Sequence, residues 1–148
     1  MKDKTDRVYL GIDYGERRVG LAVSDAGAQI AGTLTTVEAT SARRAAGAVL
    51  EAVSELDPIG IVIGYPVAPD GGEGGESCAA VDRFIRVLEK ITDLPIYRQE
   101  ERDTSATARG VVHAHGKRVG RKRRQSGAVD RIAAALILQR WLDEHAGR

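Results

Sequence analysis

The stretch VYLGIDYGERRVGLAVSD, residues 8–25, decides the fold class of this chain. It contains two apolar runs typical of buried β-strands, joined by a turn that holds Gly15, Arg17 and Arg18. So short a connection predicts that the two strands pair antiparallel. The first run ends in Asp13, although a buried strand gains nothing from a carboxylate at its tip unless that place needs negative charge.

Length and composition indicate one globular domain over residues 1–148. Apolar residues make up 43% of the chain and charged residues 29%, and no run approaches the roughly 18 apolar residues of a membrane span. The polar residues 1–7 do not resemble a signal peptide. Cys78 is the only cysteine, which excludes an intrachain disulfide. We therefore expect a cytoplasmic protein without a membrane partner.

Positive charge is concentrated in the second half of the sequence. Residues 75–148 carry 15 basic and 10 acidic side chains, whereas residues 1–74 carry 7 and 11. Six of the basic residues fall in KRVGRKRR: Lys117, Arg118, Arg121, Lys122, Arg123 and Arg124. We interpret this stretch as a loop before the last helix, and such a concentration of charge indicates a polyanionic partner.

Hydrophobic periodicity predicts three consecutive strands followed by alternating helices and strands. The expected strands cover residues 7–13, 18–25, 29–37, 60–66 and 94–100. The expected helices cover residues 40–56, 77–91 and 127–146, with another that begins near Thr104 or Ser105. This order predicts an α/β fold with a mixed five-stranded sheet, antiparallel in its first three strands and then parallel, flanked by helices.

Three acids lie at the ends of these expected elements. Asp13 ends the first strand, Glu101 follows the fifth, and Asp130 lies in the expected first turn of the last helix. Each has an ordinary explanation when taken singly: a turn residue, a surface acid and a helix-start residue favoured by the helix dipole.

Together the three acids predict a metal site. Asp130 shares a helix face with apolar residues that must pack on the sheet: Ala133, Ala134, Ile137, Leu138 and Trp141. Two strand ends and a helix start can meet at one edge of a sheet, and a divalent cation relieves the repulsion between carboxylates that meet there. Oxygen-only ligands favour Mg²⁺ or Mn²⁺ over zinc.

Four segments resemble, in order, the motifs of the YqgF/RuvX family, ribonuclease-H-like proteins described as Holliday junction resolvases and as pre-16S rRNA nucleases. They are GIDYGERRVGLAVSD, IVIGYPVAPDGGEG, EERDTSATA and AVDRIAAALILQRWL, and they span most of residues 8–142. The resemblance implies a ribonuclease-H-like fold and an acidic metal site at Asp13, Glu101 and Asp130.

The chain departs from the family pattern at four positions. The usual DERLTS reads EERDTS here, so that Glu100 replaces an Asp and Asp103 replaces a Leu. Tyr65 and Pro69 are substituted in the motif GYPVAPDG, which begins near the end of the fourth expected strand. The change at Asp103 adds an acid where the family has an apolar residue, and it leaves the substrate open.

The three acids and the basic residues predict a nuclease that hydrolyses phosphodiester bonds with Mg²⁺ or Mn²⁺. The family resemblance alone implies that it acts at the 5′ end of pre-16S ribosomal RNA. Arg17, Arg18 and the basic residues of the 117–124 stretch are expected to contact the phosphate backbone. The alternatives are cleavage of branched DNA by a Holliday junction resolvase and a nucleic-acid-binding factor without catalysis. An actin-like ATPase is the least favoured alternative, because such proteins need two such domains around a nucleotide cleft and 148 residues supply one. We expect a monomer or a weak homodimer.

Overall fold

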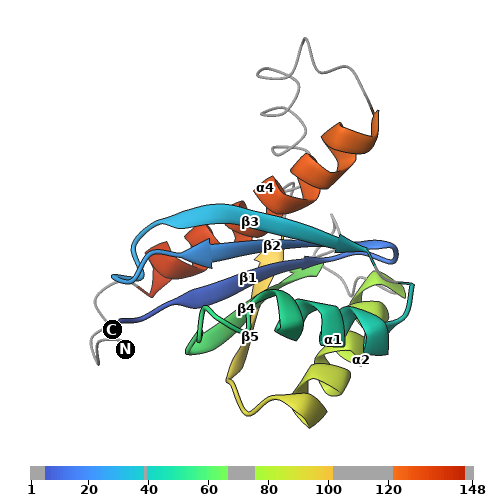
Figure 1. Ribbon diagram of the computed structural model, residues 1–148, viewed down its shortest axis with the longest axis horizontal. Helices are drawn as coiled ribbons and strands as arrows, with labels where there is room; N and C mark the ends of the chain where they lie inside the picture. Colours follow the sequence, from blue (N-terminus) through green and yellow to red (C-terminus); the bar gives the residue numbers. More distant parts are fainter. Residues whose placement is uncertain (1–5, 39, 67–75, 102–121, 146–148) are drawn as a thin grey trace.

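The computed structural model describes residues 6–38, 40–66, 76–101 and 122–145 of the chain (Figure 1). Its centre is a five-stranded sheet with the strand order β3-β2-β1-β4-β5. The strands are β1 (Tyr9–Tyr14), β2 (Arg18–Ser24), β3 (Ala31–Glu38), β4 (Gly60–Pro66) and β5 (Ile96–Glu101).

The sheet is mixed, as the sequence predicts. β1 pairs antiparallel with β2, and β2 pairs antiparallel with β3. β4 lies between β1 and β5 and is parallel to both. Because the three parallel strands run in the same direction, their carboxyl ends meet at one edge of the sheet.

Helices cover both faces of the sheet (Figure 1). α1 (Ala42–Ala52) and α2 (Glu76–Ile91) lie on one face, and α4 (Lys122–Glu144) lies on the other. Ser41 caps the first turn of α1, since its hydroxyl accepts a hydrogen bond of 3.2 Å from the backbone N–H of Arg44.

The strands bury both of their faces in two separate hydrophobic clusters. On β1, Leu10 and Ile12 pack with Phe84 on the side of α1 and α2. Tyr9 points to the other side, where its ring lies 4.8 Å from that of Trp141 on α4. By the alternation of side chains along a strand, Asp13 faces the α4 side.

Glycines on the α4 side of the sheet let the helix lie directly on the strands. A Cβ atom at Gly11 would lie 2.7 Å from the Leu138 Cβ atom and 2.9 Å from the Ala134 carbonyl oxygen. A Cβ atom at Gly20 would overlap the backbone carbonyl of Asp130. The absence of these side chains therefore fixes how closely α4 approaches β1 and β2.

The interpretation of residues 117–124 as a loop is wrong for its last three residues. α4 begins at Lys122, so Lys122, Arg123 and Arg124 are helical, and Asp130 lies about two turns inside the helix instead of in its first turn. The physical reason is that Lys, Arg and Gln are strong helix formers, which extend the apolar helical pattern backwards.

Several other predictions fall outside the described residues. They concern Lys117, Arg118 and Arg121, the expected helix near Thr104, and the residues substituted at Pro69 and Asp103.

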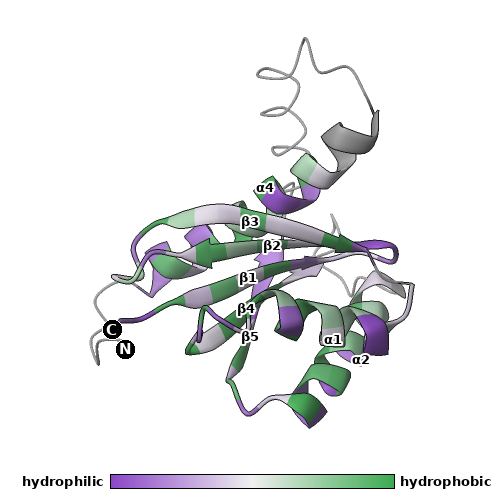
Figure 2. Cartoon of the chain, viewed as in Figure 1, coloured by the Kyte–Doolittle hydropathy of each residue, from purple (hydrophilic) through white to green (hydrophobic). Residues whose placement is uncertain are grey.

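Hydropathy follows the layers of the fold. Figure 2 shows hydrophobic segments of β1 alternating with more hydrophilic ones, and a hydrophilic turn between β1 and β2. Among the helices that the structure describes, none has the length and apolar character needed to cross a bilayer.

We expect Gly20→Ala to destabilise the protein by about 1–3 kcal/mol, because the new methyl group meets the backbone of α4, which cannot rotate away. Gly47→Ala is the matched control. Gly47 is an exposed residue of α1 with open space around its Cβ position, so this change should stabilise the fold by about 0.5–1 kcal/mol. Urea unfolding measures both free energies. Equal effects of the two substitutions would contradict this account of α4 packing.

Candidate active site

Two of the three predicted acids lie on strands that flank β4. Asp13 is the penultimate residue of β1, and Glu101 is the last residue of β5. Tyr97, which shares a face of β5 with Glu101, packs with its ring 4.9 Å from that of Trp141 on α4. Both carboxylates therefore lie on the α4 side of the sheet, at the edge where the parallel strands end.

Gly64 on β4 leaves the space in which these carboxylates approach each other. Strands two apart in a sheet are separated by about 10 Å, so side chains on β1 and β5 can meet only above β4. A Cβ atom at Gly64 would lie 2.9 Å from the Oε2 atom of Glu101 and 2.5 Å from the Cδ1 atom of Ile137. Any larger residue at this position would push Glu101 away or displace α4.

The environment of Asp13 favours its protonated form. Burial, the charges of Glu101 and Asp130 and a hydrogen bond with Glu101 together raise the pKa of Asp13 from 3.8 to about 8. Near neutral pH a proton is therefore held at Asp13, which can donate it to the Glu101 carboxylate. The acids predicted from the sequence thus come close enough for their charges to repel.

Asp130 has a different partner. Its Oδ2 atom accepts a hydrogen bond of 2.9 Å from the Nε atom of Arg18, which also makes an ion pair. Burial raises the pKa of Asp130, whereas Arg18 and Arg131 oppose that rise. The two side chains of the ion pair are 42% and 21% exposed, and pairs that reach water in this way contribute about 0.2–1 kcal/mol.

A hydrogen-bond chain from β3 holds the same part of α4. An Nη1 atom of Arg131 donates to the Thr36 hydroxyl at 3.1 Å, and that hydroxyl donates to the Gly127 carbonyl at 2.8 Å. Two neighbouring strands therefore fix the position of Asp130. β3 acts through these hydrogen bonds, and β2 acts through the close approach at Gly20 and the contact with Arg18.

The predicted phosphate-binding residues fall into three groups. Arg17 is exposed in the turn between β1 and β2, whereas Arg18 contacts Asp130. For the basic residues at the start of α4, the structure describes only the backbone.

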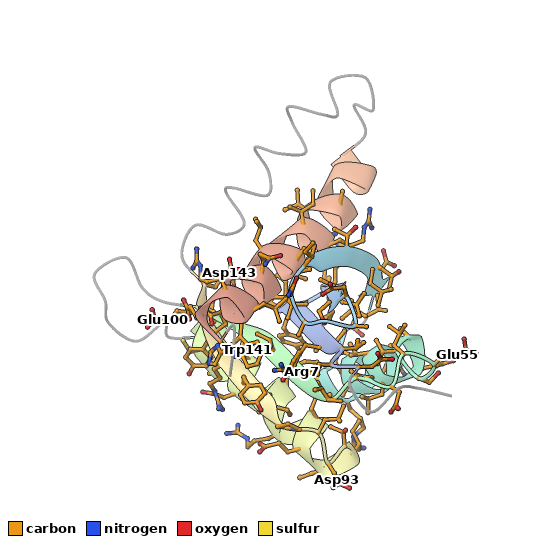
Figure 3. The ribbon with its side chains drawn as sticks, turned by 90° about the vertical axis from the view of Figure 1, so that its left-hand side faces the viewer. Arg7, Glu55, Asp93, Glu100, Trp141 and Asp143 are labelled. Carbon is orange, nitrogen blue, oxygen red and sulfur yellow. The ribbon has the colours of Figure 1, made fainter. Side chains whose placement is uncertain are left out.

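Glu100, which replaces an Asp of the family motif, is exposed. Its backbone carbonyl accepts a hydrogen bond of 3.2 Å from Arg140, which places Glu100 beside the carboxyl-terminal part of α4 (Figure 3).

The donor chemistry of the site fits a hard divalent cation. Asp13, Glu101 and Asp130 offer only carboxylate oxygens, and the charges of Glu101 and Asp130 add to burial in raising the pKa of Asp13. The arrangement of these side chains does not yet match a complete metal site. Within the part of the chain that the structure describes, no three His, Cys, Asp or Glu side chains form a group that could hold a metal ion. Asp130 is paired with Arg18 instead.

Two features of the site were not predicted from the sequence. One is the ion pair between Arg18 and Asp130, whose residues are 112 positions apart. The other is the role of Gly11, Gly20 and Gly64 in admitting α4 and Glu101. The only signal for the second is the occurrence of glycines inside strands, which often marks a close approach of another backbone.

Comparison with known proteins gives a consistent result. The model of the RuvX family, described as Holliday junction resolvase, matches residues 7–144. A protein of Syntrophus aciditrophicus described as "Putative pre-16S rRNA nuclease" is 44% identical over 134 residues, which cover 90% of this chain and 87% of the relative. A protein of Pseudomonas fluorescens with the same description is 37% identical over 141 residues, which cover 95% of both chains.

Solved structures show the same fold at low sequence identity. RuvC of Thermus thermophilus, in complex with a Holliday junction substrate, has a TM-score of 0.58 and 19% identity, and the match covers 95% of this chain and 96% of RuvC. The resolvase of Fowlpox virus, in complex with Holliday junction DNA, has a TM-score of 0.54 and 6% identity, with coverage of 94% and 99%. The predicted ribonuclease-H-like fold is therefore confirmed.

We expect the stability of the cation-free protein to fall as the pH rises. Between 3.8 and about 8, the two pKa values of Asp13 in the unfolded and folded states, the folded protein binds more protons than the unfolded chain. Urea unfolding in chelator should show a decrease of up to about 1.4 kcal/mol per pH unit between about pH 5 and pH 8. Asp130, whose pKa is also raised by burial, contributes to this decrease in stability with the same sign.

Asp13→Asn is the variant that isolates this effect. It should flatten the decrease and leave the protein more stable than wild type near pH 8, because the amide carries no charge. Parallel curves for the two proteins would contradict the raised pKa of Asp13.

Proposed function

This chain belongs to the RuvX family, and on that premise we propose that it is a divalent-metal-dependent nuclease that processes the 5′ end of pre-16S ribosomal RNA. One observation carries the proposal. Asp13 and Glu101 meet at the edge of the sheet with Asp130 near enough for its charge to act on Asp13, and burial together with these charges raises the pKa of Asp13 to about 8. A protein retains such repulsion where a cation is to be bound.

Each acid has a distinct part in this proposal. Asp13, the most central of the three, would share the bound cations with Glu101 on one side and Asp130 on the other. Divalent ions held there would supply an activated water and stabilisation of the departing oxygen. Asp13 must give up its proton to take part, and Arg18 must release Asp130.

The choice of ribosomal RNA rests on the relatives. Both curated relatives named above carry the description of a pre-16S rRNA nuclease and match nearly their full length. Such a substrate fits the basic residues at the start of α4, which precede Asp130 by about two turns, and the exposed Arg17. The proposal also places the protein in the cytoplasm, where a single cysteine stays reduced.

Cleavage of a Holliday junction is the second candidate function. The description of the family model and the fold shared with RuvC favour it. A four-way junction needs paired cuts, so this function would require two copies of the chain. We propose a monomer or a weak homodimer, which suits cleavage of RNA by one copy.

We expect labelled single-stranded RNA carrying the 5′ precursor sequence to be cut in Mg²⁺ or Mn²⁺ and to stay intact in chelator. Asp13→Asn should lower the rate by at least about 100-fold, because it removes the central carboxylate. Asp93→Asn is the matched control, since Asp93 is exposed at the end of the molecule opposite α4 (Figure 3). Gel electrophoresis of the labelled products measures both.

A four-way DNA junction in the same assay separates the candidates. Preference for the junction would favour the resolvase. Binding of both substrates without cleavage by any variant would contradict the nuclease and favour a binding factor.

We expect the affinity for RNA to fall steeply with salt, because phosphate contacts release counterions. Replacing Lys122, Arg123 and Arg124 together by Gln should reduce the slope of log K against log salt by about 2, which is 0.7 for each lost contact with a single strand. Fluorescence anisotropy at several salt concentrations measures the slope. A slope unchanged by the triple substitution would show that these residues do not contact the backbone.

A further inference from the structure

The ion pair between Arg18 and Asp130 depends on a feature of β2. Arg18 is the first residue of this strand and shares its α4-facing side with Gly20, two positions along. Because Gly20 has no side chain, the backbone of α4 at Asp130 lies against the strand. The Arg18 side chain then reaches the Asp130 carboxylate, with 2.9 Å between Nε and Oδ2.

This pair divides the acids into two classes. Asp13 and Glu101 contact each other, whereas Asp130 already has a cation. The Arg18 guanidinium thus occupies a direction from which a divalent ion would approach Asp130. Arg18 holds Asp130 through a hydrogen bond from Nε, and 42% of the Arg18 side chain is exposed. Water or an ion can therefore reach Asp130 and replace the guanidinium.

Arg18 has another anion to bind once Asp130 is taken. It follows the exposed Arg17 in the turn between β1 and β2, and it contacts the helix that begins with Lys122, Arg123 and Arg124. A phosphate backbone drawn to these charges would pass close to Arg18. The planar guanidinium, with its several N–H donors, is well suited to phosphate oxygens.

We propose that Arg18 is an internal stand-in for the divalent ion: it holds Asp130 in the cation-free protein and moves to a phosphate of the substrate when the ion takes Asp130. This inference rests on the proposed metal-dependent nuclease function. Arg18 is then a positioning residue. Cation binding and substrate binding strengthen each other, because the cation releases the Arg18 side chain from Asp130 and the substrate phosphate then binds that side chain. Such a coupling is reciprocal.

The test compares wild type, Arg18→Gln, Arg18→Lys and Arg17→Gln. Binding of Mn²⁺ without RNA is measured from the loss of the free-ion EPR signal. Binding of labelled single-stranded RNA is measured by anisotropy, with Ca²⁺ and with chelator. Arg18 is half-exposed at the start of a strand, and circular dichroism with thermal unfolding establishes that each variant folds.

We expect Arg18→Gln to bind Mn²⁺ about fivefold more tightly, the effect of removing one positive charge near a divalent ion at high dielectric constant. The same variant should bind RNA more weakly and should lose most of the gain in RNA affinity that Ca²⁺ gives to wild type. Arg18→Lys should bind Mn²⁺ like wild type, because it keeps the charge. Arg17→Gln should weaken RNA binding without changing Mn²⁺ affinity.

Opposite changes in the two affinities are the signature of the proposal, since a purely structural role for Arg18 would not produce them. Equal Mn²⁺ affinity in wild type and Arg18→Gln would overturn it. A parallel loss of Mn²⁺ and RNA binding would also overturn it, because Arg18 would then only support the fold. If wild type itself binds no Mn²⁺, the metal-dependent function fails first and this inference fails with it.

Discussion

The close approach of α4 to the sheet is the constraint on which the rest of the structure depends. Gly11, Gly20 and Gly64 lie on three neighbouring strands, and each leaves out a side chain that would collide with α4 or with Glu101. The helix buries Ala134, Leu138 and other apolar residues in that space. It also carries a carboxylate to the edge where the parallel strands end, so packing and site geometry have one origin.

The electrostatics of the site follow from this packing. Asp13 is held beside Glu101 and within reach of the charge of Asp130, and its pKa rises because the carboxyl group is buried and because the two neighbouring acids repel its charge. A proton at Asp13 and the guanidinium of Arg18 supply part of the positive charge that these carboxylates need. The arrangement costs stability at neutral pH, as functional sites commonly do, and it prepares the carboxylates to exchange these partners for cations.

Local sequence patterns predicted most of the strands and helices, but they placed the start of α4 wrongly. The apolar runs around Asp13 predicted β1 and β2 within two residues, because burial acts over short stretches of chain. The start of α4 was placed too late, since a cluster of charges suggested a loop although Lys and Arg favour helix. Asp130 consequently lacks the stabilisation of a helix amino terminus that the sequence suggested, and Arg18 takes that part.

By itself, the sequence determined the order of the elements along the chain, the mixed sheet and the two acids at the ends of β1 and β5, because hydrophobic period and strand ends are local properties. It placed Asp130 in the last helix but too near the start of that helix. The family motifs, and not the hydrophobic pattern, implied the ribonuclease-H-like fold. Only the tertiary structure decided which charges meet. The contact between Arg18 and Asp130 joins residues 112 positions apart, and the meeting of Asp13 with Glu101 needs the missing side chain of Gly64. Such contacts depend on strand register and helix depth, which no local stretch of sequence encodes.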